Sequence, residues 1–130
     1  SQRVERLRLM GYALSECMTV LPEYKAAFIA ITKENIDRFQ PQSGDTEGLV
    51  NFGLGLKDIV LSVLIIDRTE RVKMSFRSKG TFPANEFAGK YFEGGGHRNA
   101  AGGQSTETLE ETVAKFKASI QLYKKELQAI

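Results

Sequence analysis

The sequence has 130 residues, 42% hydrophobic and 26% charged, with a net charge of +2, which is typical of one globular domain with its own core. Its longest apolar run, residues 59–66, is too short to cross a bilayer, and no segment resembles a signal peptide. The single cysteine, Cys17, excludes an internal disulfide. We expect a cytoplasmic protein in which Cys17 is a buried small apolar residue.

The first elements follow from apolar spacing. Apolar residues at three- and four-residue steps predict an amphipathic helix over about residues 2–16. Two apolar segments, 18–21 and 25–32, are joined by a turn and predict a β-hairpin. Thr32 is placed to cap a short helix that ends at Phe39.

The middle of the chain predicts a second helix and a second hairpin. Asp45 or Thr46 is expected to cap a short helix over roughly residues 46–55. Residues 59–66 are apolar on both faces apart from one serine, which predicts a central strand covered on both sides. Residues 71–77 alternate and predict the partner strand. Its two faces carry Val72, Met74 and Phe76 on one side and Arg71, Lys73, Ser75 and Arg77 on the other.

Two further helices complete the predicted fold. One runs from Pro83 to about Phe92, because proline is favoured at a helix start. The last covers residues 107–128, where six apolar residues form a stripe and Thr108 and Glu111 have the spacing of a capping box. The sequence therefore predicts an α/β domain, with a mixed sheet of four to five strands, flanking helices and a long C-terminal helix packed on the sheet.

Residues 94–103 read GGGHRNAAGG and contain five glycines and the only histidine. Glycine weakens a helix or strand by roughly 0.5–1 kcal/mol per residue, so this run predicts a turn whose backbone N–H groups cradle an anion, usually phosphate. His97 and Arg98 are suited to bind phosphate or a nucleobase. The alternatives are a surface histidine and glycines that serve only a tight crossing of two backbone segments.

Basic residues lead up to this glycine run. Between residues 68 and 98 there are seven basic and three acidic residues, although the whole chain is only weakly basic. Such a segment suits a polyanion, or it is a solvated strand face. Arg77 ends the basic face of its strand, and a guanidinium there can hold phosphate oxygens through two hydrogen bonds. The helix after it would return the chain, so that the glycine run lies beside the end of this strand.

The motifs resemble the DHHA1 domain of the DHH phosphoesterase superfamily, in the NrnA-like branch of oligoribonucleases and 3′-phosphoadenosine-5′-phosphate phosphatases. Relatives of this branch include RecJ-type exonucleases and cyclic-di-AMP phosphodiesterases. Three stretches carry the resemblance, and their order and spacing cover most of the chain. They are residues 44–51 (GDTEGLVN), 73–80 (KMSFRSKG) and 94–103.

The resemblance implies a two-domain arrangement. In such proteins an N-terminal DHH domain binds two metal ions, typically manganese, and the DHHA1 domain grips the substrate across a cleft. It implies that residues 1–16 are a connecting helix from that domain and that residues 17–130 are the DHHA1-like domain. The implied substrate-binding residues are Arg77, Gly94, Gly95, Gly96, His97, Arg98 and Asn99, with Lys79 and Thr46 as further candidates.

The chain lacks what a two-metal centre needs. It has one histidine, four aspartates in separate segments and no Asp-His-His triplet. We therefore expect no catalytic residue, metal or cofactor in this chain, and binding of short single-stranded RNA or DNA or of a nucleoside phosphate without hydrolysis. The whole protein would be a manganese-dependent, exonuclease-like phosphoesterase whose partners are its own DHH domain and, in a homodimer, a second copy, with no membrane. The alternatives are a stand-alone nucleotide- or RNA-binding module and a pure interaction domain.

Overall fold

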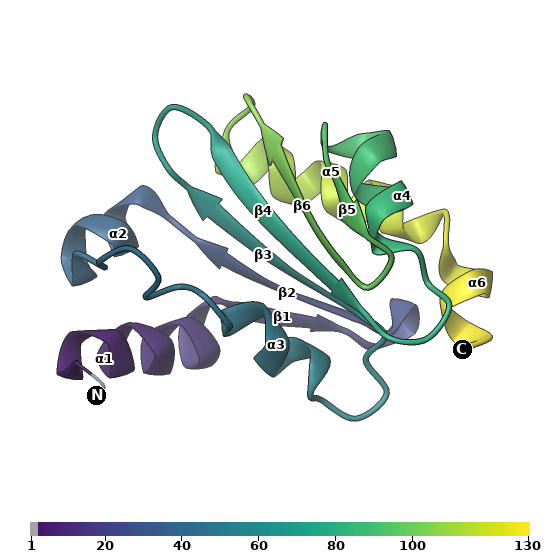
Figure 1. The fold of residues 1–130 in the computed structure, drawn as a ribbon, viewed down its shortest axis with the longest axis horizontal. Coiled ribbons are helices and arrows are strands. Elements are labelled where there is room, and N and C mark those ends of the chain that lie inside the picture. The colour runs from purple at the N-terminus through teal and green to yellow at the C-terminus, as the bar shows by residue number, and fades with distance from the viewer. Residues whose placement is uncertain (1–2) are drawn as a thin grey trace.

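The computed structural model describes residues 3–130, which form a six-stranded mixed sheet with helices on both faces (Figure 1). The strand order is β1-β2-β3-β4-β6-β5, and only β2 and β3 run parallel. The strands are β1 (Met18–Leu21), β2 (Ala26–Ile31), β3 (Leu61–Asp67), β4 (Val72–Ser78), β5 (Gly95–His97) and β6 (Ala100–Ser105). The helices are α1 (Val4–Tyr12), α2 (Lys33–Phe39), α3 (Leu49–Leu54), α4 (Ala84–Tyr91), α5 (Leu109–Gln121) and α6 (Lys124–Gln128). The predicted α/β class is confirmed, and among the described helices none is both long and apolar enough to span a membrane.

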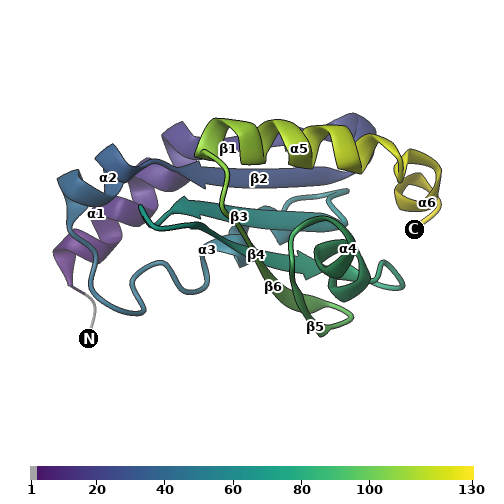
Figure 2. The same ribbon diagram turned by 90° about the horizontal axis from the view of Figure 1, so that it is seen from above.

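Strand β3 is the central strand, as its apolar sequence predicts. Its residues alternate between two cores: Val63 and Ile65 pack with α4 and α5, whereas Leu64 and Ile66 pack with α3 and the N-terminal helix. Figure 2 shows α5 and α3 on opposite sides of the sheet. A strand buried on both faces carries apolar side chains at almost every position, which explains the apolar run in the sequence. The exception is Ser62, whose hydroxyl donates a hydrogen bond to the carbonyl oxygen of Val50.

The first core is built around aromatic rings. Phe87 of α4 lies at its centre, and Phe116 of α5 meets it edge-on with ring centroids 6.1 Å apart. The rings within about 6 Å of Phe87 are those of Phe76, Phe82, Tyr91, Phe92, Phe116 and Tyr123. Such edge-on and tilted pairs add stabilisation to the burial of apolar area. This core holds α4 and α5 against one face of the sheet.

The predicted C-terminal helix packs on the sheet but is divided into α5 and α6. The chain leaves helical geometry at Tyr123, whose ring turns toward Phe87 with centroids 5.3 Å apart. After this break α6 docks on the turn between β1 and β2, where Gln128 donates a hydrogen bond to the backbone oxygen of Glu23 and Lys124 forms an ion pair with its carboxylate. The division therefore allows α5 to pack on the sheet while α6 contacts the turn between β1 and β2.

The second core includes the N-terminal helix. The helix predicted over residues 2–16 is α1, which continues as a π-helical segment, Ala13–Cys17, and residue 2 lies outside the described residues. Leu9 and Ala13 are fully buried, so this helix is part of the fold. Cys17 is half-buried beside it, where burial raises the pKa of the thiol and keeps it protonated.

Most caps and hairpins are confirmed, with one exception. Capping boxes begin α2 at Thr32 and α5 at Thr108, and both predicted hairpins pair as antiparallel strands. The prediction that Asp45 or Thr46 caps the next helix is wrong, because α3 begins after Gly48. The physical reason is that Asp45 is already bound by Arg3 of the N-terminal region and by the backbone N–H of Gln42.

We predict that Phe87→Ala lowers the free energy of unfolding by about 3–5 kcal/mol, because it removes the ring at the centre of the aromatic core. The control is Phe52→Ala on α3, whose side chain is 47% exposed and whose loss should change stability by about 0.5 kcal/mol or less. Urea denaturation of both variants measures the difference. Equal losses in the two variants would contradict the packing described above.

Candidate functional site

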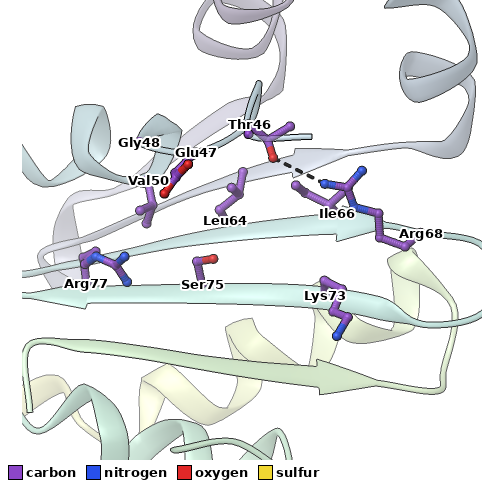
Figure 3. Close-up of a pocket in the computed structure, with 11 residues that line it drawn as sticks. Thr46, Glu47, Gly48, Val50, Leu64, Ile66, Arg68, Lys73, Ser75 and Arg77 are labelled. Atoms are coloured by element: carbon purple, nitrogen blue, oxygen red, sulfur yellow. Dashed lines mark hydrogen bonds between the residues drawn. The ribbon is translucent and has the colours of Figure 1, made fainter. Parts of the chain in front are cut away.

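The functional face of the sheet begins at strand β4. Val72, Met74 and Phe76 are buried in the aromatic core, so the residues between them must point to the other face. On that face, the β3 residues paired with β4 are covered by α3. On the other side of β4, toward β6 and β5, the face is open. The residues of β4 on this face are Lys73, Ser75 and Arg77, which lie in a line along the strand (Figure 3).

Arg77 and His97 lie in one row across three strands. Arg77 is registered with Ala100 on β6, and Ala100 with His97 on β5. Directly paired residues of antiparallel strands share a face, and two strand spacings separate the backbones of Arg77 and His97 by about 10 Å. The predicted proximity of the glycine run to the Arg77 strand is confirmed. A small alanine between a guanidinium and an imidazole leaves room for a ligand between them.

The next row along the sheet is almost free of side chains. Ser75 is registered with Gly102, and Gly102 with Gly95. A methyl group added at Gly95 would meet nothing within 4 Å, and one at Gly102 would make only an ordinary contact at 3.6 Å. Protein packing therefore does not require glycine at either position. Together these residues form a flat strip of exposed backbone beside the Arg77–Ala100–His97 row.

The glycine run is not the turn that the sequence predicts. Residues 95–97 and 100–105 form the hairpin of β5 and β6, which raises the sheet from the predicted four or five strands to six. A Cβ atom at Gly94 would lie 2.1 Å from the carbonyl oxygen of Gly102, and one at Gly96, where φ is +138°, would lie 2.9 Å from that of Ala100. The glycines allow two backbone segments to approach this closely, so part of the run serves packing.

A cavity of about 420 Å³ lies between the loop of residues 44–48 and strands β3 and β4. Figure 3 shows this loop and the start of α3 on one side of the cavity and the side chains of β4 on the other. Arg68 crosses one end, where its Nη2 donates a hydrogen bond of 3.3 Å to Oγ1 of Thr46. The lining residues are Gly44, Thr46, Glu47, Gly48, Val50, Leu64, Ile66, Arg68, Lys73, Ser75 and Arg77.

The cavity is electropositive. Within residues 3–130, neither Arg77 nor Lys73 forms an ion pair, and the guanidinium of Arg77 donates one hydrogen bond, 3.1 Å long, to the carbonyl oxygen of Phe76. Arg77 is half-buried, so its charge is only partly solvated. A partly buried cation without a carboxylate partner is a strong site for an anion, because the ligand supplies the missing charge-assisted hydrogen bonds.

The remaining predicted residues differ in their surroundings. Asn99 donates from its side-chain nitrogen to Oγ of Ser78 and to the carbonyl oxygen of Gly80, so it holds the end of β4 to the hairpin. The backbone oxygen of Arg98 accepts a hydrogen bond from the first residue of α4, while its side chain is exposed. Lys79 is exposed just beyond β4 and does not line the cavity. Thr46 does line it.

Several residues that line the cavity are not among the site residues predicted from the sequence. Arg68, Lys73, Ser75 and Glu47 belong to the basic segment or to the matching motifs, but were not singled out as site residues. The alternation of residues 71–77 already places Lys73, Ser75 and Arg77 on one face of a strand. The direction of the Glu47 side chain could not be predicted from alternation, because Glu47 lies in a loop, where side chains do not follow the two-residue repeat of a strand.

Asp45 fixes the loop that forms one wall of the cavity. Its carboxylate is buried and accepts hydrogen bonds from Nη1 of Arg3 and from the backbone N–H of Gln42, the latter 2.7 Å long. The hydrogen bond from Arg3, followed by that from Gln42, holds the pKa of Asp45 below its ordinary value of 3.8. The N-terminal region and the cavity wall are thus joined by one ionised carboxylate.

The described residues do not fit a metal site. Within residues 3–130, no group of three or more histidine, cysteine, aspartate or glutamate side chains is arranged to hold a metal ion. We therefore assign no metal-dependent step to these residues. The geometry instead offers a site for an anion, lined by the cations Arg68, Lys73 and Arg77. The strip of exposed backbone and the imidazole of His97 lie beside it.

Comparison with known proteins identifies the family. The family model described as the DHHA1 domain matches residues 24–126, which include every residue of the rows and cavity described above. The chain belongs to the DHHA1 family. This confirms the resemblance to the DHHA1 domain seen in the three sequence motifs.

Solved structures agree with this assignment of the DHHA1 domain. An exopolyphosphatase-related protein from Bacteroides fragilis is 43% identical, with a TM-score of 0.94, over 98% of this chain and 37% of its own. PggH of Vibrio cholerae, a pGpG-specific phosphodiesterase, is 16% identical with a TM-score of 0.64, over 97% of this chain and 40% of its own. RecJ of Thermus thermophilus is 18% identical with a TM-score of 0.51, over 95% of this chain and 18% of its own. No curated protein sequence matches the chain.

The glycine run of this DHHA1 domain provides a matched test of packing. We predict that Gly94→Ala destabilises the domain by about 1–3 kcal/mol, because the methyl group overlaps the carbonyl oxygen of Gly102. Gly95→Ala adds the same methyl group to open space, so stability should change by about 0.5 kcal/mol or less. Urea denaturation measures both. A Gly95→Ala variant as unstable as Gly94→Ala would show that the whole run serves packing.

The lowered pKa of Asp45 predicts a pH dependence of stability. A carboxyl group whose pKa is lower in the folded state stabilises the fold above its unfolded pKa, and this contribution is lost as the pH falls through the folded pKa. We expect wild type to melt at a higher temperature than Asp45→Asn at pH 6, and the difference to shrink as the pH falls below 3.8. Thermal unfolding from pH 2.5 to pH 7 measures it, with Asp37→Asn on α2 as control. A difference independent of pH would contradict the assigned role.

Proposed function

We propose that this DHHA1 domain is the substrate-binding domain of a metal-dependent phosphoesterase that acts on short oligonucleotides or nucleoside phosphates. The observation that carries the proposal is the row of Arg77, Ala100 and His97 on the open face of the sheet. In this row a guanidinium and an imidazole, both suited to bind phosphate, lie on either side of a small residue, next to a cavity with two more cations. The likeness to DHH-family phosphoesterases supports the same conclusion.

Phosphate would bind between Arg77 and His97. The guanidinium presents a fork of N–H donors that matches two phosphate oxygens, and the imidazole donates from the opposite side of Ala100. The imidazole of His97 makes no hydrogen bond or ion pair with any of residues 3–130 and is exposed, so the ring is free to contact a ligand. The site thus holds one phosphate by its end, which suits a terminal or small substrate.

A sugar, or the base of a neighbouring nucleotide in a longer substrate, would lie on the strip of Ser75, Gly102 and Gly95. Exposed backbone without side chains lets a flat group approach closely, and glycine at positions with open space serves that purpose. Such a contact tolerates every base, since each has a flat face. A site that holds one phosphate beside a strip of exposed backbone makes few contacts along a substrate, which favours short single-stranded substrates.

Hydrolysis would need residues outside residues 3–130. The two relatives named first are much longer, and this chain spans 37% and 40% of them. We propose that an N-terminal DHH domain of the same protein, joined through α1, holds the catalytic metal ions, which we expect to be manganese. The NrnA-like activities, on oligoribonucleotides and 3′-phosphoadenosine-5′-phosphate, a cytoplasmic location and a homodimer are part of this proposal.

The proposal is tested by calorimetry with a 5′-phosphorylated dinucleotide. We predict that Arg77→Ala and His97→Ala each weaken binding, Arg77→Ala by about tenfold or more, because a hydrogen bond to a charged group contributes about 1.5–3 kcal/mol. Arg77→Lys keeps the charge but loses the two-pronged geometry, and should fall between wild type and Arg77→Ala.

Arg8→Ala on α1 is the matched control, since it removes an exposed arginine that does not line the cavity. Thermal unfolding of each variant confirms that the fold is intact. Unchanged affinity in both site variants would refute the proposal, as would hydrolysis of the dinucleotide by the 130-residue chain in manganese.

A further inference from the structure

The cavity beside β4 contains one carboxylate among three cations. Arg68, Lys73 and Arg77 line it from the strands and the hairpin, and Glu47 is the acidic residue of the lining. Figure 3 places Glu47 on the loop side, across the cavity from Ser75 and Arg77. Three cations favour phosphate, whereas a carboxylate repels it, so the lining has two chemically different parts.

The carboxylate of Glu47 is available to a ligand. Among residues 3–130 it takes part in no ion pair and no hydrogen bond, and its side chain is exposed. Asp45, two residues earlier in the same loop, is buried and bound by Arg3 and Gln42. Asp45 therefore holds the loop in place, while Glu47 is presented toward the cavity.

The loop holds Glu47 in a defined place. Gly44 and Gly48, on either side of it, have φ angles of +90° and +87°, which only glycine adopts readily. The backbone N–H of Glu47 donates a hydrogen bond of 3.0 Å to the carbonyl oxygen of Gly44, which closes the turn. A short loop closed at Gly44 and anchored through Asp45 offers a carboxylate whose backbone does not need to move when a ligand binds.

An ionised carboxylate accepts hydrogen bonds and donates none. The part of the ligand beside Glu47 must therefore offer donors rather than phosphate oxygens. Among the bases, guanine presents two adjacent donors, N1–H and the N2 amino group, which match the two oxygens of a carboxylate. Adenine and cytosine place an acceptor beside their amino group, and uracil flanks its N–H with two carbonyls. Val50 and Leu64 form the floor of the cavity near Glu47 but are almost fully buried in the second core, so the base would be recognised by its polar edge.

We infer that Glu47 recognises the Watson–Crick edge of a guanine base, so that the site selects guanine nucleotides. This inference rests on the proposed function, because a phosphate at the cations is what brings the base to the loop. Glu47 acts in specificity and takes no part in bond cleavage. A site built to hydrogen-bond a polar group rejects the analogue that lacks it, because the carboxylate is then left unpaired and desolvated.

The test measures calorimetric affinities of the 130-residue chain for GMP, IMP, AMP, dGMP and inorganic phosphate. IMP differs from GMP only by the missing N2 amino group. We expect wild type to bind GMP about tenfold more tightly than IMP or AMP, a difference of about 1.4 kcal/mol, and to bind dGMP as tightly as GMP. In Glu47→Gln the preference for GMP over IMP should fall below twofold, while affinity for phosphate should not fall, because a like charge has been removed.

Glu34→Gln is the control, since it removes the same charge from an exposed position on α2 and should keep the full preference for GMP. Equal affinity of wild type for GMP and IMP would overturn the inference and leave the proposed function standing. A preference for GMP over dGMP that disappears in Glu47→Gln would also overturn it, because the carboxylate would then hold the ribose. If wild type bound none of the nucleotides, the proposed function and the inference would both fail.

Discussion

Strand β4 has to satisfy two environments at once, and the site depends on this constraint. One set of its side chains fills the aromatic core, with Phe76 fully buried beneath α4. The alternate set, Lys73, Ser75 and Arg77, is thereby directed to the opposite face. A slip of one residue in register would place the cations in the core, where an unpaired charge is very unfavourable. Core packing therefore fixes the register that directs these cations to the open face of the sheet.

The edge of the sheet beyond β4 is shaped by glycine for two separate reasons. Gly94 and Gly96 allow the backbone of β5 to pass close to that of β6, where any side chain would overlap a carbonyl oxygen. Gly95 and Gly102 have open space above them and leave backbone exposed on the functional face. The first pair allows the close backbone approach in the hairpin, and the second leaves exposed backbone where we propose that a ligand lies. Packing therefore requires only part of the motif to be glycine.

The loop of residues 44–48 completes the site from the other side. It is anchored by Asp45, which is held by Arg3 from the N-terminal region, and it reaches Arg68 through Thr46. Three segments far apart in sequence are therefore joined at one cavity by polar side chains. The charges within this group are divided: Asp45 is paired with Arg3, whereas among residues 3–130 the carboxylate of Glu47 and the cations of β4 form no ion pair.

The sequence by itself determined the α/β class, the central buried strand, both capping boxes and the basic face that ends at Arg77, because these depend on local periodicity and on side chains a few residues apart. It misjudged the glycine run, since the low strand propensity of glycine was outweighed by hydrogen-bond pairing with a neighbouring strand. It also misplaced the start of α3, because Asp45 found a partner 42 residues away. Only the tertiary structure decided that Arg77 and His97 share a row and that Glu47 lies across the cavity from Arg77, since register between strands and the path of a loop depend on contacts between distant segments.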